Sequence, residues 1–513
     1  MGYIGIDLGT TFSAVATIDE TGRPIIINNN DKNESYDCGN NHGNITPSCI
    51  CMNKDGSGYK VGQKARQMLH LNDDAIGRFK RDMGTDKIYE LGGKELSPTD
   101  CSAIILHRMK KIAEESIGNV SSAVVTVPAN FTNEAREATM AAAKNAGLNV
   151  EHIINEPTAA AFYYAFKSGK DLSGNYVIYD LGGGTFDVTV MKIDGKDIEV
   201  LCSNGVSTLG GDDFDQLLVN LVQKKYKDQT GQDLDPTEYT KTQAESDKIS
   251  LSSKAKVLAG GDELGGEMIT ISKKEFEEAI SSLIAQTEML CESTIDEANL
   301  ELSEISEVIL AGGSTRIPAV RKSIVSVFEK NPLDDENVDE VVALGAALYA
   351  AFKSDGVNLN PAQKQSVSNI NLQEVTNYCF GTFAISNDPN TNEIVRQNFT
   401  VIAKNTKIPA TYTESFETIR DGQTGVNCTV TQSTHEETDP SYVKVVWNGK
   451  LDGLPPNRPA GQQIDVTFAF NDSNIMECSF KDVASGKSED VQISLEASKT
   501  ESDDSVLNEL LID

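Results

Sequence analysis

Short apolar runs separated by polar, glycine-rich stretches recur along the chain. One apolar run at residues 176–179 leads into Asp180-Leu181-Gly182-Gly183-Gly184-Thr185-Phe186-Asp187, and another at residues 188–193 leaves it. Apolar runs on either side of such a stretch are typical of two strands joined by a tight turn. Glycine suits this turn because it adopts positive φ at little cost. The pattern therefore predicts a hairpin.

The same order of residues occurs twice more in related forms. Residues 4–15 read as an apolar strand, Asp7-Leu8-Gly9, a run of small residues with threonine, and a second apolar strand. Residues 308–318 read as a strand, a glycine turn and a helix start with Pro318 in its first turn. Repetition of one unit indicates a duplicated fold in which two hairpins face one cleft.

The hairpin sequences favour phosphate as a ligand. Backbone N–H groups of a turn without side chains, together with a threonine hydroxyl, hold phosphate oxygens. The neighbouring acids Asp180 and Asp187 would repel bare phosphate, but they fit a site in which Mg²⁺ lies between carboxylate and phosphate. The alternative for one such stretch by itself is an ordinary glycine-rich hairpin.

With these motifs the chain resembles the DnaK-type, seventy-kilodalton heat-shock chaperones of the actin-like ATPase superfamily. The resemblance also rests on residues 155–161, which read Asn-Glu-Pro-Thr-Ala-Ala-Ala, and on residues 312–316. It implies an α/β actin-like ATPase domain of two duplicated lobes followed by an all-β sandwich domain. The implied division is an ATPase domain at 1–352, a linker at 353–374, a peptide-binding sandwich at 375–498 and an acidic tail at 499–513.

The resemblance also implies a site between the two lobes for ATP or ADP with Mg²⁺, and K⁺ as a further ion. The implied catalytic residues are Lys80, Glu156, Asp180, Thr185 and Asp187. Asp7 and Asp180 are the implied holders of the metal shell. The implied nucleotide contacts are Asp7, Gly9, Thr10, Thr11, Phe12, Gly182, Gly183, Gly184, Thr185, Gly210, Gly211, Glu245, Lys248, Ser252, Gly312, Gly313, Ser314, Arg316 and Asp339.

Several of these residues have a physical interpretation of their own. A lysine at position 80 would neutralise charge that develops on phosphoryl oxygens, and Thr185 or Asp187 would help to place the attacking water. Pro157 keeps Glu156 extended, so its carboxylate is presented at the end of an element. Without the resemblance, Lys80 would be interpreted as a solvated lysine and Glu156 as a helix-start glutamate.

A polar helix face supplies the expected adenosine contacts. Glu245, Lys248 and Ser252 follow the spacing i, i+3 and i+7, which places them on one side of a helix. Arg316 would stack its guanidinium on the adenine from the other side. Taken alone, the helix face is an ordinary solvated surface.

Residues 28–44 form a polar insertion that is rich in Asn, Asp and Gly, and we expect a loop without an assigned role. The nine cysteines are scattered and predict no disulfide framework. Cys38, His42, Cys49 and Cys51 match no zinc-binding spacing, so buried or loop thiols are the favoured interpretation.

The region after residue 352 departs from the family pattern. In the linker, the family's leucine run is represented only by Ile370 and Leu372, which predicts weak interdomain coupling. Short strands then alternate with turns at Asp421-Gly422, Asn448-Gly449 and Ser485-Gly486, which predicts a β-sandwich. The acidic tail is too short for the family's helical lid, so we expect weak peptide affinity and fast release.

By the resemblance, the sandwich holds an extended peptide through main-chain hydrogen bonds, with one side chain in an apolar pocket. The implied pocket residues are Phe416, Ile419, Val426 and Cys428. For each of these residues alone, ordinary sandwich core is an equal alternative.

The charge balance limits the classes of partner. Asp plus Glu number 77 against 45 Lys plus Arg, a net charge of −32, which argues against nucleic acid as the main partner. The N-terminus shows no signal peptide pattern, and no apolar run approaches membrane-spanning length. We expect a soluble, cytoplasmic protein.

The favoured function is an ATP-dependent chaperone that binds extended or unfolded polypeptide, with ATP hydrolysis controlling client affinity. A nucleotide-gated co-chaperone or interaction module with a fixed partner is the alternative. A small-molecule kinase of the same superfamily is disfavoured by the terminal sandwich. A J-domain co-chaperone and a nucleotide exchange factor are further implied partners. His152 stands at a position where the family often has a basic residue that contacts the J-domain protein, so that partnership stays open.

Overall fold

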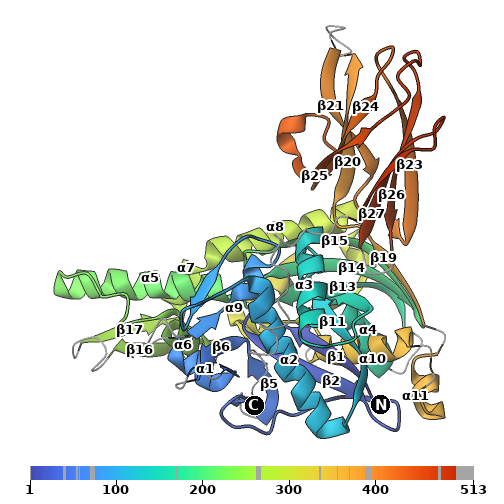
Figure 1. Cartoon of the computed structure of the whole chain (residues 1–513). Coiled ribbons are helices and arrows are strands. Elements are labelled where there is room, and N and C mark those ends of the chain that lie inside the picture. Colours follow the sequence, from blue (N-terminus) through green and yellow to red (C-terminus); the bar gives the residue numbers. More distant parts are fainter. Residues whose placement is uncertain are drawn as a thin grey trace.

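The structure is a computed structural model of the whole chain. It describes residues 2–37, 42–53, 56, 58–69, 75–168, 172–260, 267–333, 337–354, 356, 358–368, 370–387, 394–471 and 475–492. The acidic tail at 499–513 and Cys38 lie outside these described residues. An α/β part comes first in the chain, and an all-β part follows it and stands beside it (Figure 1).

The first large sheet of the α/β part has the strand order β12-β11-β1-β2-β5-β4, with β3 also paired to β2. Its strands are β1 (Gly2–Leu8), β2 (Phe12–Ile18), β3 (Pro24–Ile26), β4 (Tyr36–Asp37), β5 (His42–Pro47), β11 (Val120–Val127) and β12 (His152–Asn155). Strands β1 and β2 form the expected antiparallel hairpin, and β11 lies parallel to β1 on its other side.

The second large sheet repeats this arrangement. Its order is β18-β13-β14-β15-β19-β22, with an antiparallel β13–β14 hairpin and β18 parallel to β13. Its strands are β13 (Ser173–Leu181), β14 (Phe186–Asp194), β15 (Asp197–Val206), β18 (Ile305–Ala311), β19 (Asn371–Val375) and β22 (Lys407–Ile408). The two sheets therefore share a central unit in which a hairpin is flanked by one parallel strand.

Helices cover both sheets, which explains why the central strands are apolar on both faces. The helices are α1 (Gln63–Met68), α2 (Pro98–Ile117), α3 (Asn133–Asn145), α4 (Glu156–Ser168), α5 (Gly211–Thr230), α6 (Lys241–Ser253), α7 (Lys273–Ala279), α8 (Ser281–Glu297), α9 (Pro318–Phe328), α10 (Val341–Lys353) and α11 (Pro361–Ser366). Helices α2 and α3 pack on one face of the first sheet, while α4 and α10 share a core with residues from both sheets.

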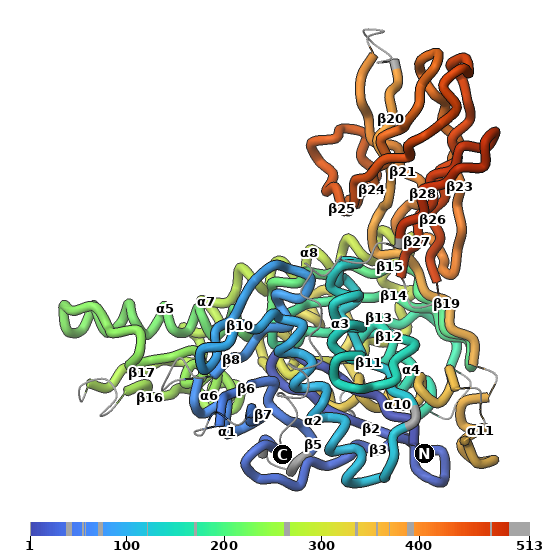
Figure 2. Tube along the Cα trace, viewed as in Figure 1, coloured from blue at the N-terminus to red at the C-terminus, as the bar shows by residue number. Residues whose placement is uncertain are grey.

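Three small sheets accompany the large ones. One consists of β7 (Tyr59–Val61), β6 (Cys49–Met52) and β8 (Ala75–Gly77), next to α1. The second consists of β9 (Tyr89–Leu91) and β10 (Lys94–Leu96), and the third of β16 (Lys256–Gly260) and β17 (Met268–Ser272). The third sheet lies beside α5 at the left of the view (Figure 2).

The predicted loop was wrong in part, and the predicted linker contains regular elements. The polar insertion at 28–44 contains β4 and the first residues of β5, and its residues 38–41 lie outside the described part of the chain. The region 353–374 contains α11 and most of β19, and β19 joins the second large sheet by parallel pairing with β15. Leu372 and Ile370 pack against the core there, and these contacts compensate for the polar composition of this region.

The all-β part consists of two four-stranded sheets with a shared apolar core. One contains β20 (Cys379–Asn387), β21 (Ile394–Ile402), β24 (Gly425–Ser433) and β25 (Lys444–Asp452). The other contains β23 (Ala410–Glu417), β26 (Gln463–Phe470), β27 (Met476–Asp482) and β28 (Ser488–Gln492). The turn predicted at Asn448-Gly449 was wrong, because both residues lie inside β25 and pair with β24. Ladder pairing along β24 overrides the local turn preference of Asn-Gly.

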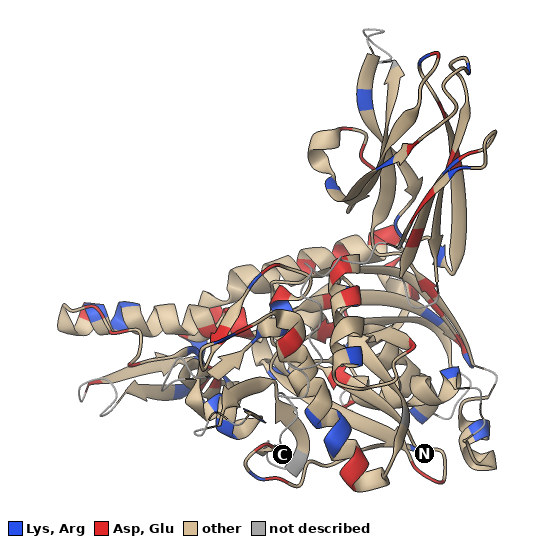
Figure 3. Cartoon of the chain, viewed as in Figure 1, with Lys and Arg blue, Asp and Glu red and all other residues tan. Residues whose placement is uncertain are grey.

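Polar contacts connect the two parts of the chain. Lys404 of the β part lies 2.8 Å from the Glu297 carboxylate of α8, and Lys444 of β25 lies 3.0 Å from Glu134 of α3. Acidic residues are spread over both parts (Figure 3), and in the whole sequence they outnumber the basic residues. No described helix is long and apolar enough to cross a membrane.

Candidate functional site

The turns of the two hairpins meet, and glycine is needed there for close approach. A Cβ atom on Gly183 would collide with the Thr11 hydroxyl, and one on Gly184 would collide with the Thr10 side chain. The expectation of positive φ was wrong for Gly182, Gly183 and Gly184, which lie outside the left-handed region. What selects glycine here is the space between the two turns, not the backbone conformation.

The third glycine turn packs against the second hairpin. Gly312 has φ +81°, so it does use the left-handed region that favours glycine. The Ser314 hydroxyl, just after it, donates to the Gly182 carbonyl over 2.9 Å. The backbone N–H groups of Gly211 and Asp212, at the start of α5, donate to the carbonyls of Gly182 and Gly183. These bonds bring the predicted motifs into one place.

Two adjoining cavities lie at this meeting point. The smaller one has a volume of about 90 Å³ and is lined by the hairpin turns together with Asp7, Lys80, Glu156 and Asp180. The larger one has a volume of about 750 Å³ and is lined by residues of α6 and of the third glycine turn. Their common walls are Thr11, Phe12, Ile45, Gly183, Gly313 and Asp339. A ligand with a compact charged end and a bulkier second half would fit both.

The small cavity concentrates negative charge. Lys80, on the short 3-10 helix η1 (Phe79–Asp82), lies 2.5 Å from Glu156, the first residue of α4. Burial, and after it the charge of Glu156, raises the pKa of Asp7 to about 7. The same two causes, together with Asp187 and Asp7, raise the pKa of Asp180 well above its ordinary value. One lysine therefore faces several carboxylates.

This charge imbalance fits a divalent cation. Carboxylates whose pKa values are raised by burial and by each other are stabilised in their charged form when a cation lies among them. Among the described residues, no three His, Cys, Asp or Glu side chains converge closely enough to hold a metal ion alone. A cation at Asp7 and Asp180 would therefore take its remaining oxygen ligands from phosphate and water.

Asp187 lies behind the small cavity and not in its wall. Its carboxylate accepts a hydrogen bond of 3.1 Å from the backbone N–H of Asn130, in the loop after β11. Burial, followed by the charge of Glu156, raises the pKa of Asp187 to about 7. The hydroxyl of Tyr378, from the start of the β part, donates to the Asn130 carbonyl at 2.8 Å. Asn130 thus contacts both a predicted catalytic acid and the β part.

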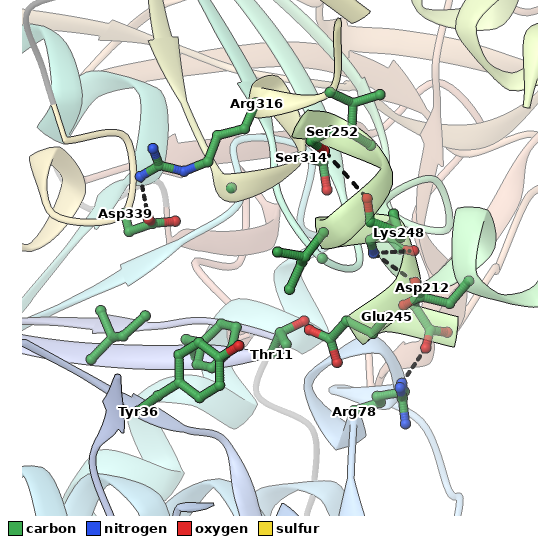
Figure 4. Close-up of a pocket in the computed structure, with 18 of the residues that line it drawn as sticks. Thr11, Tyr36, Arg78, Asp212, Glu245, Lys248, Ser252, Ser314, Arg316 and Asp339 are labelled. Carbon is green, nitrogen blue, oxygen red and sulfur yellow. Dashed lines mark hydrogen bonds and ion pairs between the residues drawn. The ribbon is translucent and has the colours of Figure 1, made fainter. Parts of the chain in front are cut away.

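The large cavity contains the predicted adenosine contacts (Figure 4). Glu245, Lys248 and Ser252 lie on one face of α6, as their spacing predicted. The Lys248 ammonium contacts the Gly211 carbonyl at 2.9 Å and the Asp215 carboxylate at 2.8 Å. Arg316 lies at the other side of the cavity, and its guanidinium pairs with Asp339 at 2.5 Å.

The sequence did not predict a group of ion pairs beside the cavity. Arg78 pairs with Asp212, and Arg81 pairs with Asp212 and Asp213, both at 3.0 Å. These pairs connect η1 to the start of α5. The only local signs of these pairs were the arginines on both sides of Lys80 and the two acids after Gly210-Gly211. Their pairing was not visible because more than a hundred residues separate the partners.

The predicted peptide-pocket residues differ in exposure. Phe416 and Val426 are half-buried against the sandwich core, and Ile419 is exposed. Cys428 is completely buried in that core, which corresponds to the alternative interpretation of this residue. The eight described cysteines are all buried and form no disulfide with one another.

Comparisons with known proteins find a family model and a curated relative that each match nearly the whole chain. The family model for "Hsp70 protein" matches residues 3–510. A curated protein of Thermotoga neapolitana, "Chaperone protein DnaK", is 36% identical over 509 residues, which cover 96% of this chain and 80% of that protein.

Proposed function

Because the chain belongs to the Hsp70 family, we propose that its two adjoining cavities hold one nucleotide, with the phosphates in the small cavity and the nucleoside in the large one. The protein is an ATP-dependent chaperone and hydrolyses ATP. The observation that carries the assignment of the site is the meeting of the two hairpin turns beside a lysine and several buried carboxylates.

We propose the domain division from the same features. Residues 1–352 form an actin-like ATPase domain of two duplicated lobes, supported by the repeated hairpin-plus-parallel-strand unit of the two large sheets. Residues 353–374 connect this domain to a peptide-binding sandwich at 375–498. The site lies where turns from both halves of the duplication meet.

Each residue of the small cavity has a proposed role. Mg²⁺, when bound, would neutralise charge on the phosphates and on Asp7 and Asp180. The Lys80 ammonium stabilises the transferred phosphoryl group, and Glu156 keeps that ammonium in place through their ion pair. Thr185 and Asp187 position the attacking water. No covalent intermediate is needed, since positioning and charge stabilisation account for phosphoryl transfer. A K⁺ ion would occupy the same charged region.

The larger cavity holds the nucleoside in this proposal. Glu245, Lys248 and Ser252 on α6 face Arg316 across it (Figure 4). Lys248 is held by Gly211 and Asp215, so its position is fixed before a ligand arrives. The sandwich binds extended or unfolded polypeptide, and a J-domain co-chaperone and a nucleotide exchange factor complete the proposed cycle.

The decisive experiment measures ATP turnover by the full chain with and without an unfolded peptide. Mg²⁺-dependent turnover that responds to the peptide is the expected result, and Asp180→Asn is the matched inactive control. Turnover that is insensitive to peptide would instead favour an interaction module with a fixed partner. Absence of nucleotide binding would overturn the proposed site.

A further inference from the structure

The polar segment at residues 28–36 is held firmly against the α/β part. The amide of Asn29, which is buried, donates to the Glu34 carboxylate at 3.2 Å and to the Thr46 hydroxyl at 3.1 Å. Glu34 also accepts a hydrogen bond of 2.6 Å from Arg108 of α2. The start of α1 donates two backbone hydrogen bonds to the segment, of 2.9 and 2.8 Å. These hydrogen bonds therefore hold the segment in a defined position in the fold.

This segment ends at Tyr36, which forms part of the wall of the large cavity (Figure 4). Tyr36 pairs with Ile45 of β5, and its ring centroid lies 4.8 Å from that of Phe12. Phe12 and Ile45 border both cavities, whereas Tyr36 borders only the large one. The aromatic surface is thus continuous from the junction of the cavities into the large cavity.

Arg66 holds the aromatic pair in place. Its guanidinium lies 4.9 Å from the ring centroid of Tyr36 and 5.5 Å from that of Phe12. The same group forms an ion pair of 2.7 Å with Glu245 of α6, and both side chains are less than 10% exposed. Cation–π contact on a desolvated guanidinium fixes the orientation of a ring. Tyr36 is consequently rigid before a ligand enters.

The position of Tyr36 determines which half of a bound nucleotide it would contact. Phosphates belong to the glycine turns, Lys80 and the carboxylates of the small cavity, which Tyr36 does not line. A nucleobase is flat and aromatic, and it gains free energy by packing on a tyrosine ring. We propose that Tyr36 is a contact for the nucleoside half of bound ATP and ADP, and that segment 28–36 serves to hold its ring in the cavity. This inference rests on the proposed nucleotide site.

The test compares ligands with and without a nucleoside. Binding of ATP, ADP and inorganic tripolyphosphate, each with Mg²⁺, is measured by calorimetry for the full chain and its variants. Tyr36→Ala should weaken ATP and ADP binding about tenfold, which corresponds to about 1.4 kcal/mol, and leave tripolyphosphate binding within about twofold. Tyr36→Phe keeps the ring and should bind all three ligands like the wild type. Tyr442→Ala, at an exposed tyrosine of the sandwich, is the matched control.

Two outcomes overturn the inference and leave the nucleotide site intact. One is ATP affinity of Tyr36→Ala within about twofold of the wild type. The other is an equal loss for tripolyphosphate, which would mean that Tyr36 acts through the fold. If the wild type itself binds neither ATP nor ADP, the proposed site fails and this inference fails with it. Should Tyr36→Ala not fold, Tyr36→Leu carries the same expectations, because it removes the ring and keeps apolar bulk.

Discussion

The ammonium of Lys80 lies 2.5 Å from the carboxylate of Glu156, and only 3% and 7% of these residues are exposed. A buried ion pair of this kind leaves a large penalty when one partner is removed, because the other charge stays desolvated. The pair also stands next to Asp7 and Asp180, so Lys80 balances more than one carboxylate. A change at Lys80 should therefore affect both the free energy of unfolding and the rate of ATP hydrolysis.

The first prediction concerns that pair. Lys80→Ala should lower the turnover number about 100-fold or more with ATP affinity nearly unchanged, since the lysine charge matters most as the phosphoryl oxygens gain charge. Without nucleotide, the same variant should lose about 3 kcal/mol of unfolding free energy. Adding Glu156→Gln should restore much of that stability but none of the turnover. Chemical denaturation and steady-state kinetics measure both; equal losses in affinity and rate would contradict the assigned role.

The second prediction concerns Asp180. Asp180→Asn should reduce Mg²⁺-dependent hydrolysis by orders of magnitude, because a neutral amide holds the shell of the cation less well. Nucleotide-free Asp180→Asn should at the same time be at least as stable as the wild type near neutral pH, since one crowded buried charge is gone. Turnover is measured across a Mg²⁺ titration. Wild-type turnover in the variant would exclude Asp180 from the metal shell.

The third prediction is a pH dependence of stability that depends on Asp187. Folding raises the pKa of this carboxyl from its ordinary 3.8 to about 7, mainly through burial and then through Glu156, against the opposing charges of Lys80 and Arg136. The folded state therefore binds the proton more tightly, and its stability falls as the pH rises from about 4 through about 7. Asparagine does not titrate, so Asp187→Asn should gain on the wild type between pH 5 and 8, by on the order of 2 kcal/mol.

Thermal or urea unfolding of the nucleotide-free protein at several pH values measures this difference. Asp194→Asn, at the exposed end of the same strand, is the control. A difference between Asp187→Asn and the wild type that is constant with pH would show that Asp187 keeps an ordinary pKa.

The fourth prediction concerns Tyr378. Its hydroxyl donates to the carbonyl and to the side-chain oxygen of Asn130, and the N–H of Asn130 holds Asp187. Tyr378→Phe removes these bonds and keeps the ring, so it should change turnover about fivefold at an unchanged KM, which corresponds to about 1 kcal/mol. Tyr442→Phe, at an exposed tyrosine of the same domain, should change nothing. Identical kinetics in both variants would show that the β part does not influence Asp187.

Local features of the sequence were enough to place the elements around the three glycine turns. The two hairpins follow from apolar runs broken by glycine, as do strand β18 and helix α9 on either side of the third glycine turn. Local rules failed where long-range pairing competed with them. Asn448-Gly449 has the residues of a turn, yet it continues β25 because both residues pair with β24.

In residues 353–374 as well, local sequence features missed a long-range strand pairing. Weak coupling between the domains was predicted there because only Ile370 and Leu372 represent the leucine run of the family linker. In the structure, the parallel pairing of β19 with β15 adds hydrogen bonds that composition cannot reveal. The strength of coupling is still a prediction, but its structural basis is a strand and not a flexible connection.

The sequence by itself determined the glycine turns and their neighbouring acids, because these are residue types at short spacing that favour a phosphate site. The expected roles of Lys80, Glu156 and the polar face of α6 came from the family resemblance. The tertiary structure decided which charges meet. Lys80 and Glu156 are 76 residues apart, Arg66 and Glu245 are 179 apart, and Tyr378 and Asn130 are 248 apart. Contacts at such separations depend on how sheets and helices pack. That packing is set by the whole core, so no local pattern in the sequence records it.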